Sequence, residues 1–416
     1  MSSIQQRILH YGRRRICWLP LRVAAIFPAA FLVAIALGQV NLGLIFYVRE
    51  RFAASPTQVG WLAAAWSLSY VTGCVLVRPR VDRFRAHSTT ASAAVTMATL
   101  TLLMQAVPAP GGLPWIFLLH ACSGLALSHY WPPLMGWLTS TQDEGRQLGR
   151  LVSVYNCFWS SGMVISPFLA GWLSEQHPRW PLAAGSTAFL ASGAVIVGVS
   201  TLIRGVKHTP VVTEDCDDSD GNRRDTGTPL RFPAWTGLFA TFVGLGVLLA
   251  VFPVGGREEL DLSKRVVGGL LLVRALANAS GFVLLAQTSF WHFRLAPMVL
   301  AQILAATAFA ALSVTDSLPA MAMLMVLLGA TLSMGYSGSI FHGVSGSASR
   351  AGRMAVHESL LAFGIVTGSA LGGMLYDATT LGTVYLTCAV LMVTVAALQL
   401  IIGMKGGCFG GTKLLP

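Results

Sequence analysis

Two formal charges, Arg274 and Glu358, stand inside stretches of this sequence that are otherwise apolar. A charged side chain at the centre of a membrane span costs about 2.5–3.5 kcal/mol, so each needs a partner or a water-filled cavity. A partly buried carboxylate can take up and release a proton, and a guanidinium can bind a carboxylate through two parallel hydrogen bonds. Because the two charges have opposite signs and similar expected depths, we expect Arg274 and Glu358 to face the same cavity.

Other polar and aromatic side chains are expected to line that cavity. Residues four apart share a helical face, whereas His357 is turned about 100° from Glu358 and is not expected beside it. The predicted substrate-binding residues are Asn41, Trp66, Tyr70, His129, Asn156, Arg274, Asn278 and Tyr336, with Glu358 as the proton carrier. The alternative for Asn156 and Asn278 is hydrogen bonding between helices, and for His129 a satisfied position in the core.

The composition places the chain in a membrane. Of its 416 residues 54% are hydrophobic and 11% are charged, with a mean hydropathy of +0.65, whereas soluble domains are about one-quarter charged. A bilayer is crossed by about 20 apolar residues in a helix. Twelve such runs predict an all-α polytopic membrane protein, with spans at about 23–46, 57–77, 88–107, 114–138, 149–173, 181–203, 233–254, 266–289, 296–313, 318–341, 354–376 and 382–404.

The net charge of +11 does not indicate a nucleic-acid partner, because the basic residues sort by loop. Loops next to membrane spans carry most of their Lys and Arg on the cytoplasmic side. Only six of the 28 Lys and Arg residues fall in the alternate loops: Arg49, Arg51, Arg179, Arg257, Lys264 and Arg265. Both termini are therefore predicted to be cytoplasmic, and we expect a monomer in a plasma membrane, the inner membrane of a bacterium.

Several function classes find no support in the sequence. The seven cysteines show no CxxC pair and no metal-ligand spacing, so packing is favoured over a disulfide framework or a metal site. No G-x-x-x-x-G-K-[ST] loop is present for a nucleotide, and no Ser/His/Asp or paired-carboxylate constellation indicates an enzyme. We expect no cofactor, and transport would have to draw on a gradient. The expected partners are a small-molecule substrate, protons and the lipid bilayer.

The chain divides into two halves around residues 205–231, a polar segment rich in Asp that is typical of a linker. The predicted order is a cytoplasmic tail 1–22, a six-span bundle 23–204, a cytoplasmic linker 205–231, a six-span bundle 232–404 and a tail 405–416. Matching residues recur between the halves, which indicates a repeat. Phe27-Pro28-Ala29 recurs as Phe232-Pro233-Ala234, Val59-Gly60 as Val267-Gly268, Gly124 as Gly329, and Gly162 with Gly171 as Gly364 with Gly373. The same offsets relate Arg274 to Trp66, Asn278 to Tyr70, and Glu358 to Asn156.

Twelve spans in two parallel repeats with a long linker resemble the major facilitator superfamily. The loop RPRVDRFRA after the second span is similar to the family motif G-x-L-x-D-R-x-G-R-R. It keeps Asp82 and Arg83, but Arg78 and Arg85 stand where the motif has glycines. The resemblance implies that Asp82 and Arg83 belong to a cytoplasmic gate, and the alternative is an ordinary basic loop.

The fifth span, GMVISPFLAG, resembles the antiporter motif G-x-x-x-G-P-x-x-G-G of the same family. It keeps Gly162 and Pro167, and the second half has a related pattern at Gly364 and Gly368. Small residues every fourth position let helices approach closely, so a gating role is predicted for these four residues, with ordinary tight packing as the alternative.

The family resemblance implies a secondary transporter that works by alternating access. The expected substrate is a small organic solute, with an anionic one fitting Arg274 best, and the expected coupling is to protons. Two alternatives remain: a drug or metabolite efflux antiporter, as the fifth-span motif suggests, and a transporter-like membrane scaffold or sensor that no longer transports.

Overall fold

The computed structural model describes residues 25–81, 86–139, 146–202, 227–347 and 350–405, and their regular structure is helical. The first bundle contains α3 (Ile26–Phe52), α4 (Pro56–Val81), α5 (Ala86–Ala106), α6 (Leu113–Leu127), α7 (Trp131–Thr139), α8 (Arg146–Gln176) and α9 (Trp180–Leu202). The second contains α10 (Arg231–Ala250), α11 (Phe252–Glu258), α12 (Lys264–Ala286), α13 (Ala296–Leu312), α14 (Leu318–Val344), α15 (Arg350–Ala378) and α16 (Leu381–Lys405). Each of the twelve predicted spans corresponds to one of these helices or to a consecutive pair.

Two spans that were predicted as continuous are broken in the structure. The fourth consists of α6 and α7, and Pro132 and Pro133 occupy the first turn after the break. The seventh consists of α10 and α11, with Pro253 in the first turn of α11. A proline has no N–H to donate and restricts the residue before it, so a helix begins again at such a position more readily than it continues through. Seven of the described helices are both long and apolar enough to cross a membrane by themselves.

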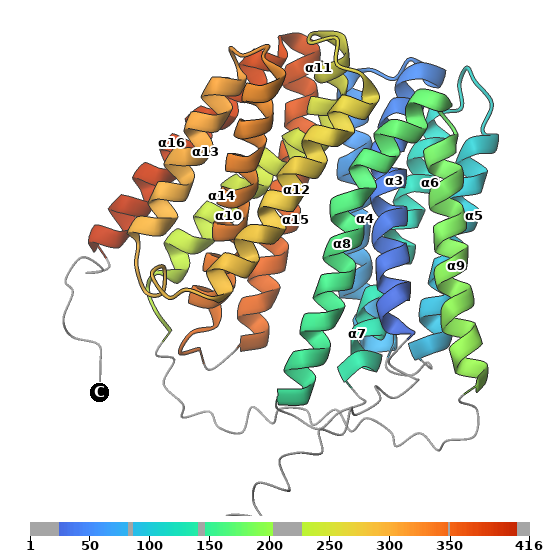
Figure 1. The fold of residues 1–416 in the computed structure, drawn as a ribbon, viewed down its shortest axis with the longest axis horizontal. Coiled ribbons are helices and arrows are strands. Elements are labelled where there is room, and N and C mark those ends of the chain that lie inside the picture. The colour runs from blue at the N-terminus through green and yellow to red at the C-terminus, as the bar shows by residue number, and fades with distance from the viewer. Residues whose placement is uncertain (1–24, 82–85, 140–145, 203–226, 348–349, 406–416) are drawn as a thin grey trace, which may run out of the picture.

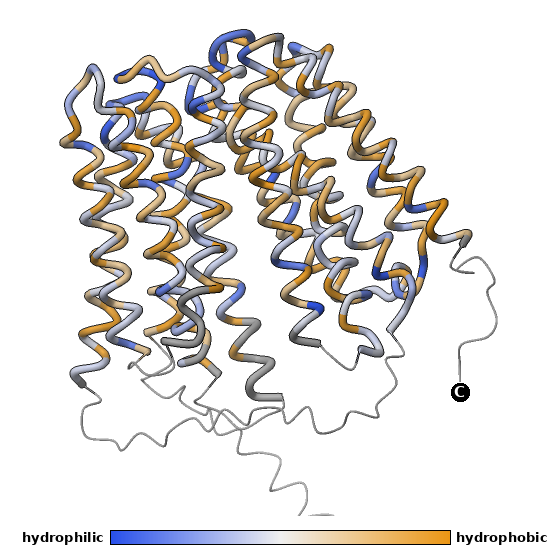
Figure 2. Tube along the Cα trace, turned by 180° about the vertical axis from the view of Figure 1, so that it is seen from behind, coloured by the Kyte–Doolittle hydropathy of each residue, from blue (hydrophilic) through white to orange (hydrophobic). Residues whose placement is uncertain are grey.

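The two bundles meet at one end of the molecule and separate toward the other (Figure 1). We call the end at which α9 finishes and α10 starts the linker end, and the end where the bundles meet the opposite end. Figure 2 shows the same separation from behind, with hydrophobic residues along most of each helix and hydrophilic ones gathered mainly in the loops of the opposite end.

Glycines allow the bundles to touch backbone to backbone at two helix crossings near the opposite end. A Cβ atom on Gly60 of α4 would fall on the carbonyl oxygen of Ser369 in α15, and one on Gly268 of α12 would fall on that of Pro167 in α8. Both approaches are closer than 3.0 Å, which real Cβ atoms essentially never show. Gly60 and Gly268 are the glycines that the repeat relates, so the repeat in the sequence appears as two equivalent crossings.

Three motif glycines, Gly162, Gly364 and Gly368, pack helices inside their own bundles. A Cβ atom on Gly162 of α8 would lie 2.7 Å from the Phe31 carbonyl oxygen of α3. One on Gly364 of α15 would lie 2.9 Å from the Phe239 oxygen of α10, and Gly368 approaches α10 even more closely. The close packing expected of these glycines is therefore confirmed, while their role in gating stays a prediction.

A polar clasp joins the bundles at the opposite end. It consists of the ion pairs Arg49–Glu258 and Lys264–Glu50, and of the Thr57 hydroxyl, which donates to the Asp377 carboxylate at 2.7 Å. The Lys264 ammonium also donates to the Ser174 carbonyl oxygen at 3.0 Å. The hydrogen bonds and ion pairs identified between described residues of the two bundles lie at this end.

Glu175 of α8 contributes a further contact of this kind, accepting the Arg265 backbone N–H at the start of α12 at 3.1 Å. Burial favours a raised pKa for the Glu175 carboxyl, but hydrogen bonds from Ser263 and Arg265, with the nearby Arg265 and Arg257 charges, bring the pKa below its usual value. The carboxylate therefore stays ionised at neutral pH, as is favourable at a helix N-terminus.

We expect Gly60→Ala to disfavour the conformation in which the bundles meet at the opposite end. Overpacking of this kind costs about 1–3 kcal/mol, enough to change a population about fivefold or more. In a background without other cysteines, disulfide formation between Thr57→Cys and Asp377→Cys measures the closed state and should fall. Gly198→Ala is the matched control, because a Cβ atom there meets nothing within 4 Å. Equal crosslinking in the two alanine variants would contradict the tight crossing.

Candidate functional site

Glu358 lies on the face of α15 that turns toward the other bundle. Ser369, at the crossing with α4, is eleven residues further along, which at about 100° per residue places it about 20° from Glu358. The exposed side chains of Phe363 and Met374 lie about 140° and 160° away, on the outer surface of the bundle. Glu358 is itself exposed although it faces the first bundle. The two bundles are thus separated at this depth, and we call the space between them at the linker end the cleft.

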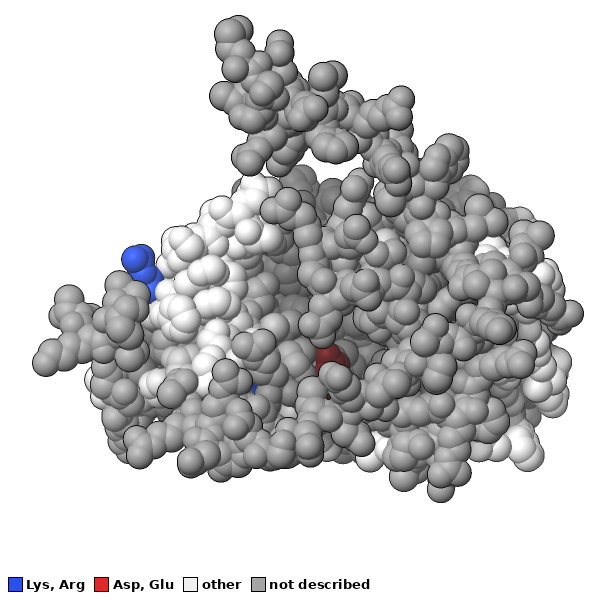
Figure 3. All heavy atoms as spheres, turned by 90° about the horizontal axis from the view of Figure 1, so that it is seen from below, with Lys and Arg blue, Asp and Glu red and all other residues white. Residues whose placement is uncertain are grey.

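Side chains from two other helices, α4 and α14, lie near the Glu358 carboxylate. Charge interactions connect it to Tyr70 and Cys74 of α4 and to Tyr336 of α14. The Tyr336 ring lies 5.4 Å from the Phe282 ring, centroid to centroid. Among the described residues no Lys or Arg forms an ion pair with Glu358. Viewed from the linker end, Figure 3 shows a small acidic surface near the centre of the molecule, with a smaller basic surface to its lower left.

His357 is turned away from Glu358, as the helical angle predicted. It is buried, and its Nδ1 atom lies 2.9 Å from the hydroxyl oxygen of Ser339 in α14. Its ring also packs edge-on against Tyr336, with centroids 4.9 Å apart. His357 therefore holds α15 against α14 behind the wall of the cleft.

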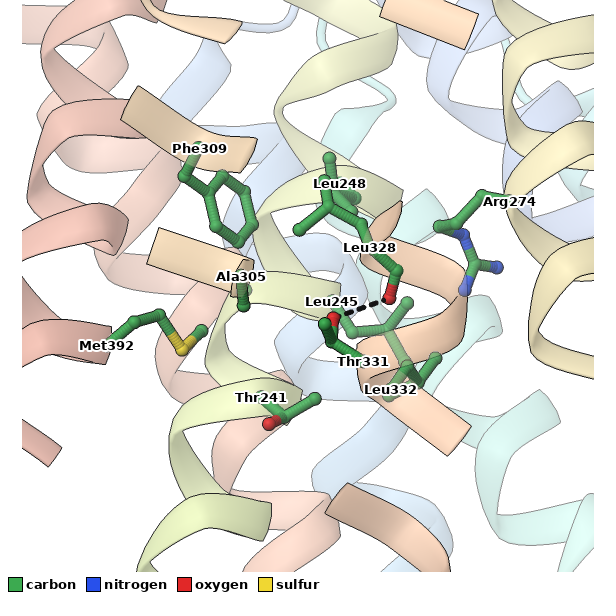
Figure 4. Close-up of a pocket in the computed structure, with 11 residues that line it drawn as sticks. Thr241, Leu245, Leu248, Arg274, Ala305, Phe309, Leu328, Thr331, Leu332 and Met392 are labelled. Atoms are coloured by element: carbon green, nitrogen blue, oxygen red, sulfur yellow. Dashed lines mark hydrogen bonds between the residues drawn. The ribbon is translucent and has the colours of Figure 1, made fainter. Parts of the chain in front are cut away.

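Arg274 does not lie beside Glu358, so the expectation of a shared cavity is wrong for this structure. Only 8% of Arg274 is exposed, and its side chain lines a small cavity inside the second bundle. Figure 4 shows it reaching from α12 toward Leu328, Thr331 and Leu332 of α14. The cavity has about 10 Å³ of free space, at the lower limit for a single water molecule. No hydrogen bond or ion pair joins the guanidinium to a described residue, and its Nε atom is buried without a partner.

The repeat explains the direction of Arg274. It follows Gly268 by six residues, as Trp66 follows Gly60, so both side chains are turned about 120° from the crossing and into their own bundles. The Trp66 ring stacks on the His120 ring of α6 in the first bundle, with centroids 6.0 Å apart. The repeat in the sequence correctly related Arg274 to Trp66, but it could not show which neighbouring helix each of the two side chains contacts.

Asn156 is the repeat partner of Glu358, and it also faces the cleft. It is exposed on α8, and Pro167 and Gly171, at the crossing with α12, follow it at the same spacings that separate Ser369 and Gly373 from Glu358. The cleft therefore has a carboxylate on one wall and a carboxamide at the equivalent position on the other.

The remaining predicted residues are dispersed. Asn41 of α3 and Asn278 of α12 are half-buried, each with a side-chain oxygen that has no partner in the described chain. His129 lies in the break between α6 and α7, with its Nδ1 atom 3.1 Å from the Leu125 carbonyl oxygen. Asp82 and Arg83 lie outside the described residues. The structure thus brings Tyr70, Tyr336 and Glu358 together, with Trp66 stacked on Tyr70.

Cys74 is a neighbour of Glu358 that sequence reasoning missed. It follows Tyr70 by four residues and so shares its helical face, which is the signal that could have identified it. Phe282 was missed in the same way, four residues after Asn278.

Thiol labelling should separate the cleft from the bundle interior. In detergent-solubilised protein without other cysteines, Glu358→Cys and Asn156→Cys should react with a small, permanently charged methanethiosulfonate. Arg274→Cys should react on the order of tenfold more slowly, because its thiol is buried. Phe363→Cys on the outer face of α15 is the control, where detergent shields the thiol from a charged reagent. Rapid labelling at position 274, or equal labelling at 358 and 363, would contradict the proposed geometry.

Comparison with known proteins agrees with the fold. Residues 26–344 match the sequence profile described as Major Facilitator Superfamily. The structure is similar to that of the nucleoside transporter NupG, with a TM-score of 0.69, 12% identity and coverage of 92% of this chain and 99% of that one. It is also similar to a bacterial homolog to the human lysosomal transporter Spinster in an inward-facing, unoccupied conformation, with a TM-score of 0.67, 16% identity and coverage of 95% and 99%. No curated protein matches the sequence. At these identities the likeness shows the fold alone.

Proposed function

The chain belongs to the Major Facilitator Superfamily, and we propose that it moves a small organic solute across the membrane by alternating access, in exchange or together with protons. The observation that carries the proposal is Glu358, a carboxylate at membrane depth that is exposed between two bundles. Among the described residues, the backbone crossings and the clasp hold the bundles together at the opposite end, an arrangement that allows opening at the linker end.

We propose that the linker end faces the cytoplasm, which makes this conformation open to the inside. The support is the loop charge, because the segments assigned to this end carry most of the 28 Lys and Arg residues. The tails 1–22 and 405–416 and the linker 205–231 are then cytoplasmic, and residues 23–204 and 232–404 form the two bundles of a monomer in a plasma membrane, that of a bacterium. Asp82 and Arg83 keep their predicted place in the cytoplasmic gate.

Glu358 offers a physical reason for coupling. In this conformation its carboxylate reaches water, so its charge is tolerated. Closing the linker end would remove that water, and an uncompensated charge in a membrane interior costs several kcal/mol. The cleft can therefore close only after the carboxylate has taken up a proton or has bound a compensating group.

The charge of the solute is the part of the sequence-based hypothesis that changes most. The anionic solute was inferred from Arg274, and this residue points into the second bundle. Within the described residues, the wall around Glu358 offers phenols, a thiol and a carboxylate. The efflux alternative keeps the support of the Gly162 and Pro167 motif, and nucleosides, the solutes of NupG, are one neutral class to test.

Replacing the proposed proton carrier should uncouple transport. Protein reconstituted in liposomes with an internal pH dye is exposed in turn to amines, carboxylates, nucleosides and sugars. For any class that triggers proton movement through the wild-type protein, Glu358→Gln should abolish that movement, because an amide cannot carry a proton across. Exchange of labelled solute against unlabelled solute should persist in the same variant.

Asp316→Asn, a change of an exposed carboxylate in the loop between α13 and α14, is the control of equal charge. Coupled proton movement that survives in Glu358→Gln would remove Glu358 from the mechanism. A folded wild-type protein that moves neither protons nor any solute of these classes would favour the scaffold or sensor alternative.

The clasp should bias the equilibrium between the two open states. Arg49→Glu places a carboxylate opposite Glu258, and repulsion should lower the Thr57→Cys/Asp377→Cys crosslink defined above. The exchange Arg49→Glu with Glu258→Arg should restore it, because the pair is then reversed and intact. Such a partly exposed pair contributes only about 0–1 kcal/mol, so the effect on thermal stability should be small. A double variant no better crosslinked than Arg49→Glu alone would show that the charges do not act as a pair.

A further inference from the structure

The described part of the cleft has a single kind of charge. The described acidic residues other than Glu358 all lie in the loops and helix ends of the opposite end: Glu50, Glu175, Glu258, Glu259, Asp261, Asp316 and Asp377. Two described cations, Arg274 and Arg353, could be expected to neutralise the Glu358 charge, but neither side chain faces Glu358. Arg274 points into the second bundle, while Arg353 lies over the Trp235 ring at 5.6 Å and is turned about 140° from Glu358 on the same helix.

Aromatic rings from both bundles lie near this carboxylate, and the Tyr336 ring packs 4.9 Å, centroid to centroid, from that of His357, the residue before Glu358. Tyr70 comes from α4 in the first bundle and Tyr336 from α14 in the second, and both interact with the Glu358 charge. Each ring is held in place by another aromatic side chain: Tyr70 stacks with Trp66 at 6.2 Å, and Tyr336 packs edge-on against Phe282 at 5.4 Å. A carboxylate near fixed aromatic rings is a chemical environment that attracts ammonium groups, through charge and through the ring faces.

We propose that the transported solute is an organic cation, a protonated amine or a quaternary ammonium compound, bound by Glu358, Tyr70 and Tyr336 in competition with a proton. The proposal deepens the transport function proposed above and rests on it. It names the charge of the solute and the group that recognises that charge.

Competition for one carboxylate turns the site into an exchanger. When the cation binds, the proton leaves Glu358 for water, and when the cation leaves, a proton can take its place. The cleft closes with Glu358 neutralised by either of them, but not with the bare carboxylate. Each complete cycle therefore moves a cation in one direction and a proton in the other.

The exchanged proton can be assigned to Glu358 from the groups that face it. Tyr70, Cys74 and Tyr336 are uncharged while they keep their protons, so a cation gains most from the carboxylate. His357, the other titratable group on this turn of α15, is held by Ser339 on a different face.

Binding of tetraphenylphosphonium to the purified full-length protein in detergent tests the proposal. This cation carries a charge that does not depend on pH, and tetraphenylborate is an anion of nearly the same shape. We expect wild-type protein to bind the cation and, at pH values low enough for Glu358 to be protonated, to release up to about one proton per cation bound in weak buffer. Over the same pH range its affinity should fall by up to about tenfold per unit of falling pH. Tetraphenylborate should bind at least about tenfold more weakly.

Variants of the protein test which residues bind the cation and release the proton. Glu358→Gln should bind the cation about tenfold more weakly and without proton release or pH dependence, whereas Asp316→Asn should match the wild type. Glu358→Asp should keep the proton release, because it keeps a carboxylate. It replaces Glu358→Gln in the comparison if that variant does not yield monodisperse protein. Tyr336→Leu should weaken binding while preserving its pH dependence.

Equal or tighter binding of tetraphenylborate to wild-type protein would overturn the proposal without any variant. Proton release that persists undiminished in Glu358→Gln would overturn the assignment to this carboxylate. The two proposals fail separately: cation binding with no solute flux in liposomes contradicts transport, and nucleoside or carboxylate flux with no cation binding contradicts the solute class.

Discussion

The close approach of helices at the opposite end is the constraint on which the rest of this structure depends. Gly60 and Gly268 have no Cβ atom, and one at either position would fall on the backbone of the facing helix, α15 or α8. Because the bundles touch there through backbone, and the clasp adds ion pairs at the same end, the described helices of the two bundles separate toward the linker end (Figure 1). That separation is what exposes Glu358 to water, so the chemistry of the cleft follows from the geometry of the two crossings, one of which lies more than ten residues away along α15.

Much of this architecture could be predicted from sequence, because it depends on properties that one chain carries locally. Apolar runs located the spans, and the recurrence of Val59-Gly60 as Val267-Gly268 predicted two equivalent positions that the structure shows as two equivalent crossings. Breaks in the fourth and seventh spans were missed, since hydropathy does not register the prolines that restart a helix.

The direction of Arg274 could not be predicted for a different reason. Helical periodicity relates side chains on one helix to each other, but it does not show which neighbouring helix each face meets. Had Gly268 been recognised as the residue that faces α8, the angle of about 120° to Arg274 would have placed the guanidinium inside its own bundle. The same reasoning would have placed Asn156 and Glu358 on the cleft, at equal spacings from the two crossings.

The repeat is symmetric in geometry and asymmetric in charge, and this asymmetry suggests how a binding event can act on the conformation. Glu358 corresponds to Asn156 and Arg274 to Trp66, so the second bundle carries both internal charges and the first supplies uncharged counterparts. Glu358 also shares a single helix with Ser369 and Gly373, which form one crossing about 16–22 Å away along the helix axis. In the proposed cycle, neutralising Glu358 favours movement of the linker half of α15 toward α4. A rigid helix that moves at one end must turn at the crossing, and there the clasp residue Asp377 lies one turn beyond Gly373. The charge state of one carboxylate can therefore alter the contacts that hold the opposite end closed.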